Sequence, residues 1–309
     1  MPGLIDLVRP KVHAFDASGR TLERRTYRID CELRYEVAAP TEFIFLVHAQ
    51  DTSEQLVTQE CLSFRPALEH RVFEDHARGH RFTRLSVERG EFTLSYRALV
   101  RRTPPPALKR GRETPIAELP DALLPLLLPT RYCESDKLAS AAQKLFGGHA
   151  PGHARVQAIA DWIHDSIEYA PGSTDTTTTA GDVFVRRAGV CRDFAHLGIA
   201  MCRALNIPAR LVVGHAPFEA PPPDFHAIFE AWLGGRWVAF DPTRMSPVED
   251  LVRIATGRDA KDVAFATFYG PAKLLSMEPR IERVDARAAA AHRDGAPLTA
   301  IPSATASGA

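Results

Sequence analysis

The sequence predicts an α+β protein, in which a β-sandwich precedes a core where one helix packs on an antiparallel sheet. Three observations lead to this fold class. Short runs of alternating apolar and polar residues recur about every ten residues between positions 26 and 102. A run with helical period starts at Cys191. Further on, Gly234-Gly235 separates two apolar runs, which is typical of a β-hairpin.

Residues 1–25 carry no convincing period, and we expect an irregular arm there. From Thr26 onward the alternation predicts six strands: Tyr27–Val37, Glu42–Val47, Gln55–Phe64, Glu69–Asp75, Arg81–Glu88 and Glu91–Leu99. Several short strands at regular spacing are typical of a β-sandwich. The sequence therefore predicts a sandwich domain over residues 26–102.

A linker follows over residues 103–118, because Thr103-Pro104-Pro105-Pro106 leads into the charged, turn-rich segment Lys109–Glu113. We expect one larger domain over residues 119–285. Residues 286–309 are rich in Ala and then in Pro, Ser, Thr and Gly, which predicts a frayed helix and a disordered tail.

Apolar periodicity predicts helices within the larger domain over Leu119–Pro129, Ser135–Phe146 and His153–Ser166. Asp182 is expected to cap a short helix over Val183–Arg187. The Thr-rich loop Ser173–Ala180 delivers the chain to Cys191, so we expect this loop to line the functional site.

The run from Cys191 to Leu205 predicts a buried helix. Its apolar residues recur at steps of three and four: Phe194, Leu197, Gly198, Met201 and Leu205. Asn206 and Pro208 are typical of a helix end. Cys191 is thus expected at the N-terminus of the helix, where the positive end of the dipole favours a thiolate.

The hairpin predicts where an imidazole and a carboxylate lie. With Gly234-Gly235 as the turn, Ile228 on strand 227–233 lies opposite Asp241, which follows strand 236–240. His226 has the parity of Ile228, so His226 and Asp241 are diagonal neighbours on one face of the sheet, which also carries Glu230. A slip of one residue would place them on opposite faces.

Together, Cys191, His226 and Asp241 offer a nucleophile, a general base and a group that orients the base. A single Cys at a helix start is usually a small buried hydrophobic residue. We keep that structural interpretation for the other cysteines, Cys31, Cys61, Cys133 and Cys202, and a structural hydrogen bond for His196.

Three segments carry a family resemblance: Gly189–His196 before the helix, His226-Ala227 before Phe240-Asp241-Pro242-Thr243, and Gly257-Arg258-Asp259 with Asp262-Val263. Over about residues 155–275 the chain resembles the bacterial transglutaminase-like family of papain-related thiol enzymes. The resemblance implies a nucleophile helix packed on an antiparallel sheet, with Cys191 as nucleophile, His226 as general base and acid, and Asp241 as orienter. It also favours an N-terminal β domain.

The chain departs from the family pattern around the expected pocket. Ile228 stands where Trp is usual, Ala260 where an aromatic residue is usual, and Val213-Gly214-His215 replaces Ser-Gly-Tyr. We expect His215 to contact substrate. Asp193 is interpreted as a helix cap or a partner of Arg, and Glu230 as a pocket-shaping or paired carboxylate. Arg258 and Asp259 are expected to buttress the site. A Trp donates to the oxyanion in eukaryotic transglutaminases, but Trp162 is expected to pack.

The predicted chemistry is acyl transfer on amide or peptide bonds through a Cys191 thioester, with hydrolysis (amidase or cysteine peptidase) favoured over the cross-linking of a protein-glutamine gamma-glutamyltransferase. Two other classes stay open. One is a non-catalytic scaffold with a relic triad. The other is an acyltransferase acting on a CoA-bound group near Arg186, Arg187 and Arg192. No cofactor is expected, and no metal, because the sequence lacks zinc-like Cys and His spacing and a calcium-like acidic loop.

The amino-acid composition limits which classes of partner and which compartment are expected. The 38 basic and 38 acidic residues balance, so neither nucleic acid nor an anionic membrane is an expected partner. Five cysteines, an odd number, argue against a disulfide framework and favour a reducing compartment. With no signal peptide recognised, we expect a soluble cytoplasmic protein acting on a peptide or protein amide. The oligomeric state is left open.

Overall fold

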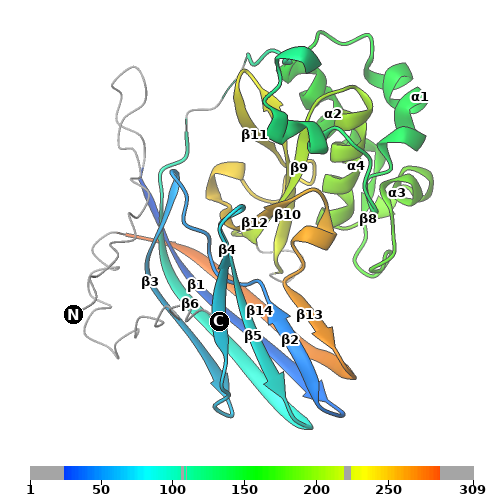
Figure 1. The fold of residues 1–309 in the computed structure, drawn as a ribbon. Coiled ribbons are helices and arrows are strands. Elements are labelled where there is room, and N and C mark those ends of the chain that lie inside the picture. The colour runs from blue at the N-terminus through cyan, green and yellow to red at the C-terminus, as the bar shows by residue number, and fades with distance from the viewer. Residues whose placement is uncertain (1–23, 106–107, 109, 219–223, 286–309) are drawn as a thin grey trace. The chain divides into compact units, whose positions relative to one another are not determined.

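The computed structural model describes residues 24–105, 108, 110–218 and 224–285 of the chain (Figure 1). Contacts divide the chain into two units, Met1–Pro106 with Ala266–Ala309 and Ala107–Phe265. The predicted arm over residues 1–25 falls almost wholly outside the described residues, and the predicted tail over 286–309 does so entirely. No described helix is long and apolar enough to cross a membrane.

The first unit contains two four-stranded antiparallel sheets, ordered β14-β1-β6-β3 and β13-β2-β5-β4. Their strands are β1 (Arg25–Val37), β2 (Thr41–Phe45), β3 (Gln55–Arg65), β4 (Arg71–Asp75), β5 (His80–Val87), β6 (Gly90–Arg102), β13 (Ala266–Tyr269) and β14 (Ala272–Val284). All six strands predicted before residue 103 are present. The two sheets meet through aromatic side chains, as Tyr35 of β1 contacts Phe43 and Phe45 of β2 at 5.4 and 5.6 Å between ring centroids.

Alternation along β1 explains why this sheet forms. From Tyr27 to Val37 buried residues strictly alternate with exposed ones, so one face of the strand enters the core and the other meets solvent. β6 pairs with β1 in continuous register from Arg25↔Arg102 to Val37↔Gly90.

The expected domain over residues 119–285 extends too far. β13 pairs with β2, and β14 pairs with β1 over nearly the whole strand, from Thr26↔Val284 to Val37↔Ala272. Residues 266–285 therefore belong to the sheets of the first unit. Local alternation within 266–285 did not reveal these partners, which lie more than 200 residues earlier in the chain.

The second unit contains one antiparallel sheet, ordered β11-β10-β9-β12, with helices on one face (Figure 1). Its helices are α1 (Ser135–Phe146), α2 (His153–Ser166), α3 (Ala180–Arg186) and α4 (Cys191–Ala204), with 3-10 turns at Ile116–Glu118, Asp121–Leu126, Val248–Asp250 and Ala260–Asp262. Its strands are β9 (Ala209–His215), β10 (His226–Leu233), β11 (Arg236–Phe240) and β12 (Val252–Gly257), with a short parallel pair β7 (Glu168–Tyr169) and β8 (Ala188–Gly189).

The cap of α3 differs from expectation. Thr179 is the N-cap, and its hydroxyl accepts from the Asp182 N–H at 3.3 Å. Asp182 is the third helical residue, and its carboxylate accepts in return from the Thr179 N–H at 3.0 Å. This reciprocal pair is a capping box, so the helix starts three residues earlier than predicted. A carboxylate such as Asp182 suits an N-cap, but Thr179 precedes it by the three residues that a capping box requires, so Thr179 is the N-cap.

The hairpin forms in the predicted register. Trp232 pairs with Trp237, and Gly234 and Gly235 both adopt positive φ, 59° and 80°, as a tight two-residue turn requires. Helix α4 packs on β10 at Gly198, where a Cβ would lie 2.5 Å from the ring of Phe229. This close approach positions the N-terminus of α4 relative to the start of β10.

Candidate active site

Cys191 is the first residue of α4, as predicted. It retains 8% exposure, whereas Cys31, Cys133 and Cys202 are each 0% exposed. Its thiol lies 3.8 Å from the carbonyl oxygen of Phe225, the residue before His226. The thiol thus combines a helix N-terminus with a neighbouring imidazole, the two features that favour a reactive thiolate.

The structure brings His226 and Asp241 together as the register predicts. The Nε2 atom of His226 lies 2.8 Å from Oδ2 of Asp241, and both side chains are almost fully buried. The other ring nitrogen, Nδ1, has no hydrogen-bond partner among the described residues, while the interaction of the ring with the Cys191 thiol contributes to its raised pKa. The imidazole therefore bridges the thiol and the carboxylate.

Electrostatics favour a charged imidazole at this position. Burial alone would lower the pKa of His226. The hydrogen bond to Asp241 and the interaction with Cys191 outweigh burial and raise the pKa of His226 to about 10. Near neutral pH this environment stabilises the imidazolium that a thiolate needs as its partner.

Asp241 is itself held by a residue whose role was not predicted. Its Oδ1 accepts from both the N–H and the hydroxyl of Thr243, at 2.9 and 2.7 Å. Thr243 belongs to the quoted Phe240-Asp241-Pro242-Thr243 segment, and Asp followed two residues later by Thr is the signal of such a turn. Thr243 fixes one carboxylate oxygen, so the other faces His226.

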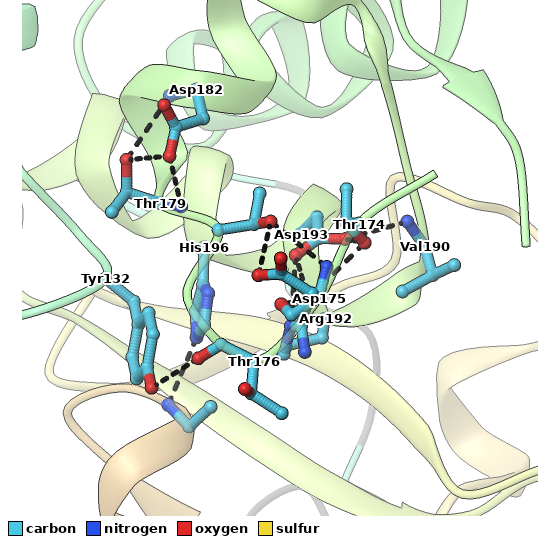
Figure 2. Close-up of polar contacts among 12 residues, drawn as sticks. Tyr132, Thr174, Asp175, Thr176, Thr179, Asp182, Val190, Arg192, Asp193 and His196 are labelled. Carbon is cyan, nitrogen blue, oxygen red and sulfur yellow. Dashed lines mark hydrogen bonds and ion pairs between the residues drawn. The ribbon is translucent and has the colours of Figure 1, made fainter. Parts of the chain in front are cut away.

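Asp193 joins the start of α4 to the preceding Thr-rich loop (Figure 2). Its Oδ2 accepts from the Val190 N–H at 3.0 Å and from the Thr174 hydroxyl at 2.6 Å. Arg192 donates to Oδ1 at 2.8 Å and to the carbonyl of Asp175. The predicted roles as a cap and as a partner of Arg are both present, and together they hold the backbone on either side of Cys191.

His196 contributes a structural contact, as expected. Its ring stacks on Tyr132 at 5.3 Å between centroids, and its Nε2 accepts from the Ala260 N–H at 3.1 Å (Figure 2). Burial lowers the pKa of His196 to about 4, so the ring is neutral. Asp259 completes this contact by accepting from the Tyr132 N–H at 3.1 Å. Asp259 thus supports α4 indirectly, because it holds Tyr132, whose ring stacks on His196 in the helix.

Two further predicted site residues contact other side chains of the second unit. Arg258 forms a half-exposed ion pair with Asp262 at 2.9 Å. His215 is 1% exposed, and its ring packs against Phe225 at 5.3 Å. His215 thus packs against the residue whose carbonyl meets the thiol, and its expected contact with substrate stays a prediction.

Glu230 is a paired carboxylate, in agreement with one of its predicted roles. It is 1% exposed and forms ion pairs with Arg210, at 2.8 Å, and with Arg253. Burial would raise the pKa of Glu230, but Arg253 and Arg210 lower it to about 2. Both carboxylate oxygens are therefore engaged with these two arginines.

A second unpredicted contact involves Tyr169, the last residue of β7. Interactions with the backbone N–H and the thiol of Cys191 both affect the pKa of its hydroxyl. No motif in the sequence marked Tyr169, because its proximity depends on the parallel pairing of β7 with β8.

Two of the three arginines named for a CoA-type ligand have other partners. Arg187 lies over the ring of Trp162 at 4.7 Å, and Arg192 faces Asp193. Trp162 also packs against Phe184 at 5.8 Å, in agreement with a packing role. Among the described residues no group of three or more His, Cys, Asp or Glu side chains could hold a metal ion.

Comparison with known proteins places both units. Residues 139–242 match the model of the transglutaminase-like superfamily, and residues 25–109 match that of the bacterial transglutaminase N-terminal domain. A candidate cysteine protease from Cytophaga hutchinsonii superimposes with a TM-score of 0.80 and 43% sequence identity, over 85% of this chain and 92% of that chain.

Mycobacterial proteins of uncharacterized function are also similar. One from Mycobacterium leprae is 34% identical over 45% of this chain and 52% of its own length. One from Mycobacterium tuberculosis is 34% identical over 34% of this chain and 38% of its own length. The chain thus spans about half, or less, of the length of these curated relatives.

Proposed function

Because the chain belongs to the transglutaminase-like superfamily, we propose that it is a thiol acyl-transfer enzyme that hydrolyses amide or peptide bonds. One observation carries the proposal. His226 Nε2 lies 2.8 Å from Asp241, while Nδ1 is free to face a thiol at the first residue of a helix. Thiol, imidazole and carboxylate then form a relay in the order that acyl transfer needs.

The mechanism follows from this geometry. Nδ1 of His226 takes the thiol proton, and the Sγ thiolate of Cys191 attacks the carbonyl carbon. A C–S bond forms while the π electron pair of the C=O bond moves to oxygen. The tetrahedral adduct collapses, the C–N bond breaks, and His226 returns the proton to the leaving amine. A thioester remains on Cys191.

Water resolves the thioester in the proposed reaction. His226 removes a proton from the attacking water, the C–O bond forms, and the thiolate leaves to regenerate the free enzyme. An amine in place of water would give transamidation instead. We favour hydrolysis because the structurally similar protein from Cytophaga hutchinsonii is considered a cysteine protease.

Alkylation of the native protein with iodoacetamide from pH 5 to 9 tests the reactive pair. At pH 6 an ordinary thiol, with a pKa of about 8.5, is almost wholly protonated. We expect Cys191 to react at least about tenfold faster than Cys61, a partly exposed thiol that serves as internal control. In His226→Ala this advantage should disappear. Peptide mapping by mass spectrometry assigns the label to each cysteine.

Slow labelling of Cys191 would contradict the proposal. If Cys191 reacts at pH 6 no faster than Cys61, the acyl-transfer proposal is wrong and a scaffold with a relic triad takes its place.

Adding methylamine during turnover of p-nitrophenyl acetate distinguishes hydrolysis from transamidation. Acetate as the main product supports hydrolysis, whereas N-methylacetamide as the main product indicates transamidation.

A further inference from the structure

Tyr169 reaches Cys191 because two short strands run in parallel just before α4. Tyr169 pairs with Gly189 between β7 and β8, and the Ala170 N–H donates to the Gly189 carbonyl at 2.9 Å. Gly189 lies two residues before Cys191. The ring of Tyr169 also packs against Phe194, one turn into α4, with centroids 5.8 Å apart. The backbone pairing and the ring contact therefore place Tyr169 beside the first turn of α4.

Several backbone N–H groups at the start of α4 already have acceptors within the helix and its first turn. The N–H groups of Asp193 and Phe194 donate to the Val190 carbonyl, at 2.8 and 3.0 Å, and the Val190 N–H donates to Asp193. The N–H of Cys191 instead interacts with the Tyr169 hydroxyl, and this interaction lowers the pKa of the phenol. Since this N–H belongs to the nucleophile itself, it lies where the oxygen of an attacked carbonyl collects negative charge.

We propose that Tyr169 is a catalytic residue, whose hydroxyl is the second donor of the oxyanion hole beside the Cys191 N–H. The inference rests on the proposed acyl-transfer function. When a carbonyl oxygen enters between the two groups, it accepts from the Cys191 N–H in place of the phenol oxygen. The Tyr169 hydroxyl then donates to the same oxygen, and both bonds strengthen as that oxygen becomes anionic.

The local environment suits the donor role. Burial and the nearby Cys191 and Asp224 raise the pKa of Tyr169, so its hydroxyl keeps its proton throughout the working range of a thiol enzyme. Trp162, the donor suggested by distant relatives, is engaged with Phe184 and Phe146 at 5.8 and 5.9 Å. Tyr169 supplies a donor from a different element.

The variant Tyr169→Phe tests this role, because it removes the hydroxyl and keeps the ring contact with Phe194. Two reagents are compared on the full-length protein. Acylation by p-nitrophenyl acetate passes through an oxyanion, whereas alkylation by iodoacetamide displaces iodide and develops no oxyanion. We expect the acylation rate of Cys191 to fall at least about tenfold and its alkylation rate at pH 6 to stay within about twofold of wild type.

Matched variants distinguish the alternatives. Tyr269→Phe, an exposed tyrosine of β13, should change neither rate, and Cys191→Ser gives the background with the ester. Equal loss of acylation and alkylation in Tyr169→Phe would overturn the proposal, because the hydroxyl would then only position the thiol. Unchanged acylation would also overturn it, while fast alkylation of wild type at pH 6 would leave the acyl-transfer function standing. If wild type shows neither reaction above background, the proposed function itself fails.

Discussion

At the scale of single residues, the charge state of His226 governs the site. Asp241 and Cys191 raise its pKa against the effect of burial, and the hydrogen bond to Asp241 is the largest single contribution that raises it. Thr243 in turn holds the far oxygen of Asp241 through two hydrogen bonds. The carboxylate therefore does more than orient the ring, because it keeps the imidazolium stable while the thiol carries negative charge.

Replacing Asp241 with Asn should expose this dependence on pH. The amide is nearly the same size, but it lacks the charge that raises the pKa of His226, so less imidazolium and thiolate form together near neutrality. We expect alkylation of Cys191 at pH 6 to slow at least about tenfold, and the difference to shrink toward pH 9, where hydroxide supplies the thiolate. The pH profile of iodoacetamide labelling measures it.

Asp161→Asn is the matched control, because Asp161 forms a half-exposed pair with Arg244. Its profile should follow wild type. A uniform slowing of Asp241→Asn at every pH would contradict the electrostatic role, and would assign Asp241 to folding or positioning alone.

At the scale of elements, the contact between α4 and β10 determines where the nucleophile lies relative to the base. Gly198 lies in the middle of α4, and Phe229 lies three residues after His226 on β10. A Cβ at position 198 would come within 2.5 Å of the Phe229 ring. The helix and the strand therefore approach each other more closely than any residue other than glycine at position 198 would allow. The separation of Cys191 from His226 depends on this approach.

Gly198→Ala should therefore destabilise the second unit by about 1–3 kcal/mol, through overpacking against the rigid ring. Urea unfolding followed by tryptophan fluorescence measures this unit alone, because Trp162, Trp232 and Trp237 all belong to it. The matched control is Gly148→Ala, an exposed glycine whose added Cβ would meet nothing within 4 Å. Equal stability of the two variants would show that α4 moves away from β10 without cost.

At the scale of the whole molecule, the first unit is assembled from both ends of the described chain. β14 lies at the edge of its sheet and pairs with β1 over nearly its whole length, while β13 extends the other sheet beside β2. The segment after the second unit is thus a structural part of the first. β1 is a central strand only when β14 is present.

A chain ending at residue 265 should accordingly leave β1 as an unprotected edge. We expect those β1 amides that bond to β14 to lose protection from hydrogen exchange, and the truncated protein to aggregate more readily through this edge. A chain ending at residue 285 keeps β14 and serves as control. Mass spectrometry of peptides from Arg25–Val37 reports the exchange. Full protection of β1 in the shorter chain would rule out this role for β14.

The elements that depend on local pattern could be predicted from the amino-acid sequence alone. The period of three and four predicted α4 within one residue, and the Gly234-Gly235 turn predicted the register that brings His226 to Asp241. Turn geometry and strand parity act over a few residues, so neighbouring side chains suffice to determine them. Six strands of the sandwich were found for the same reason.

Only the tertiary structure decided the features that join distant segments. Twelve of the thirteen residues of β14 pair with a strand more than 200 positions earlier. Asp193 joins the Thr-rich loop to α4, and the parallel strand pair brings Tyr169 beside the first turn of α4. These contacts form because folding buries apolar surface and satisfies backbone hydrogen bonds between strands. The alternation of apolar and polar residues along a strand indicates that one face is buried, but it does not indicate which other strand pairs with its edge.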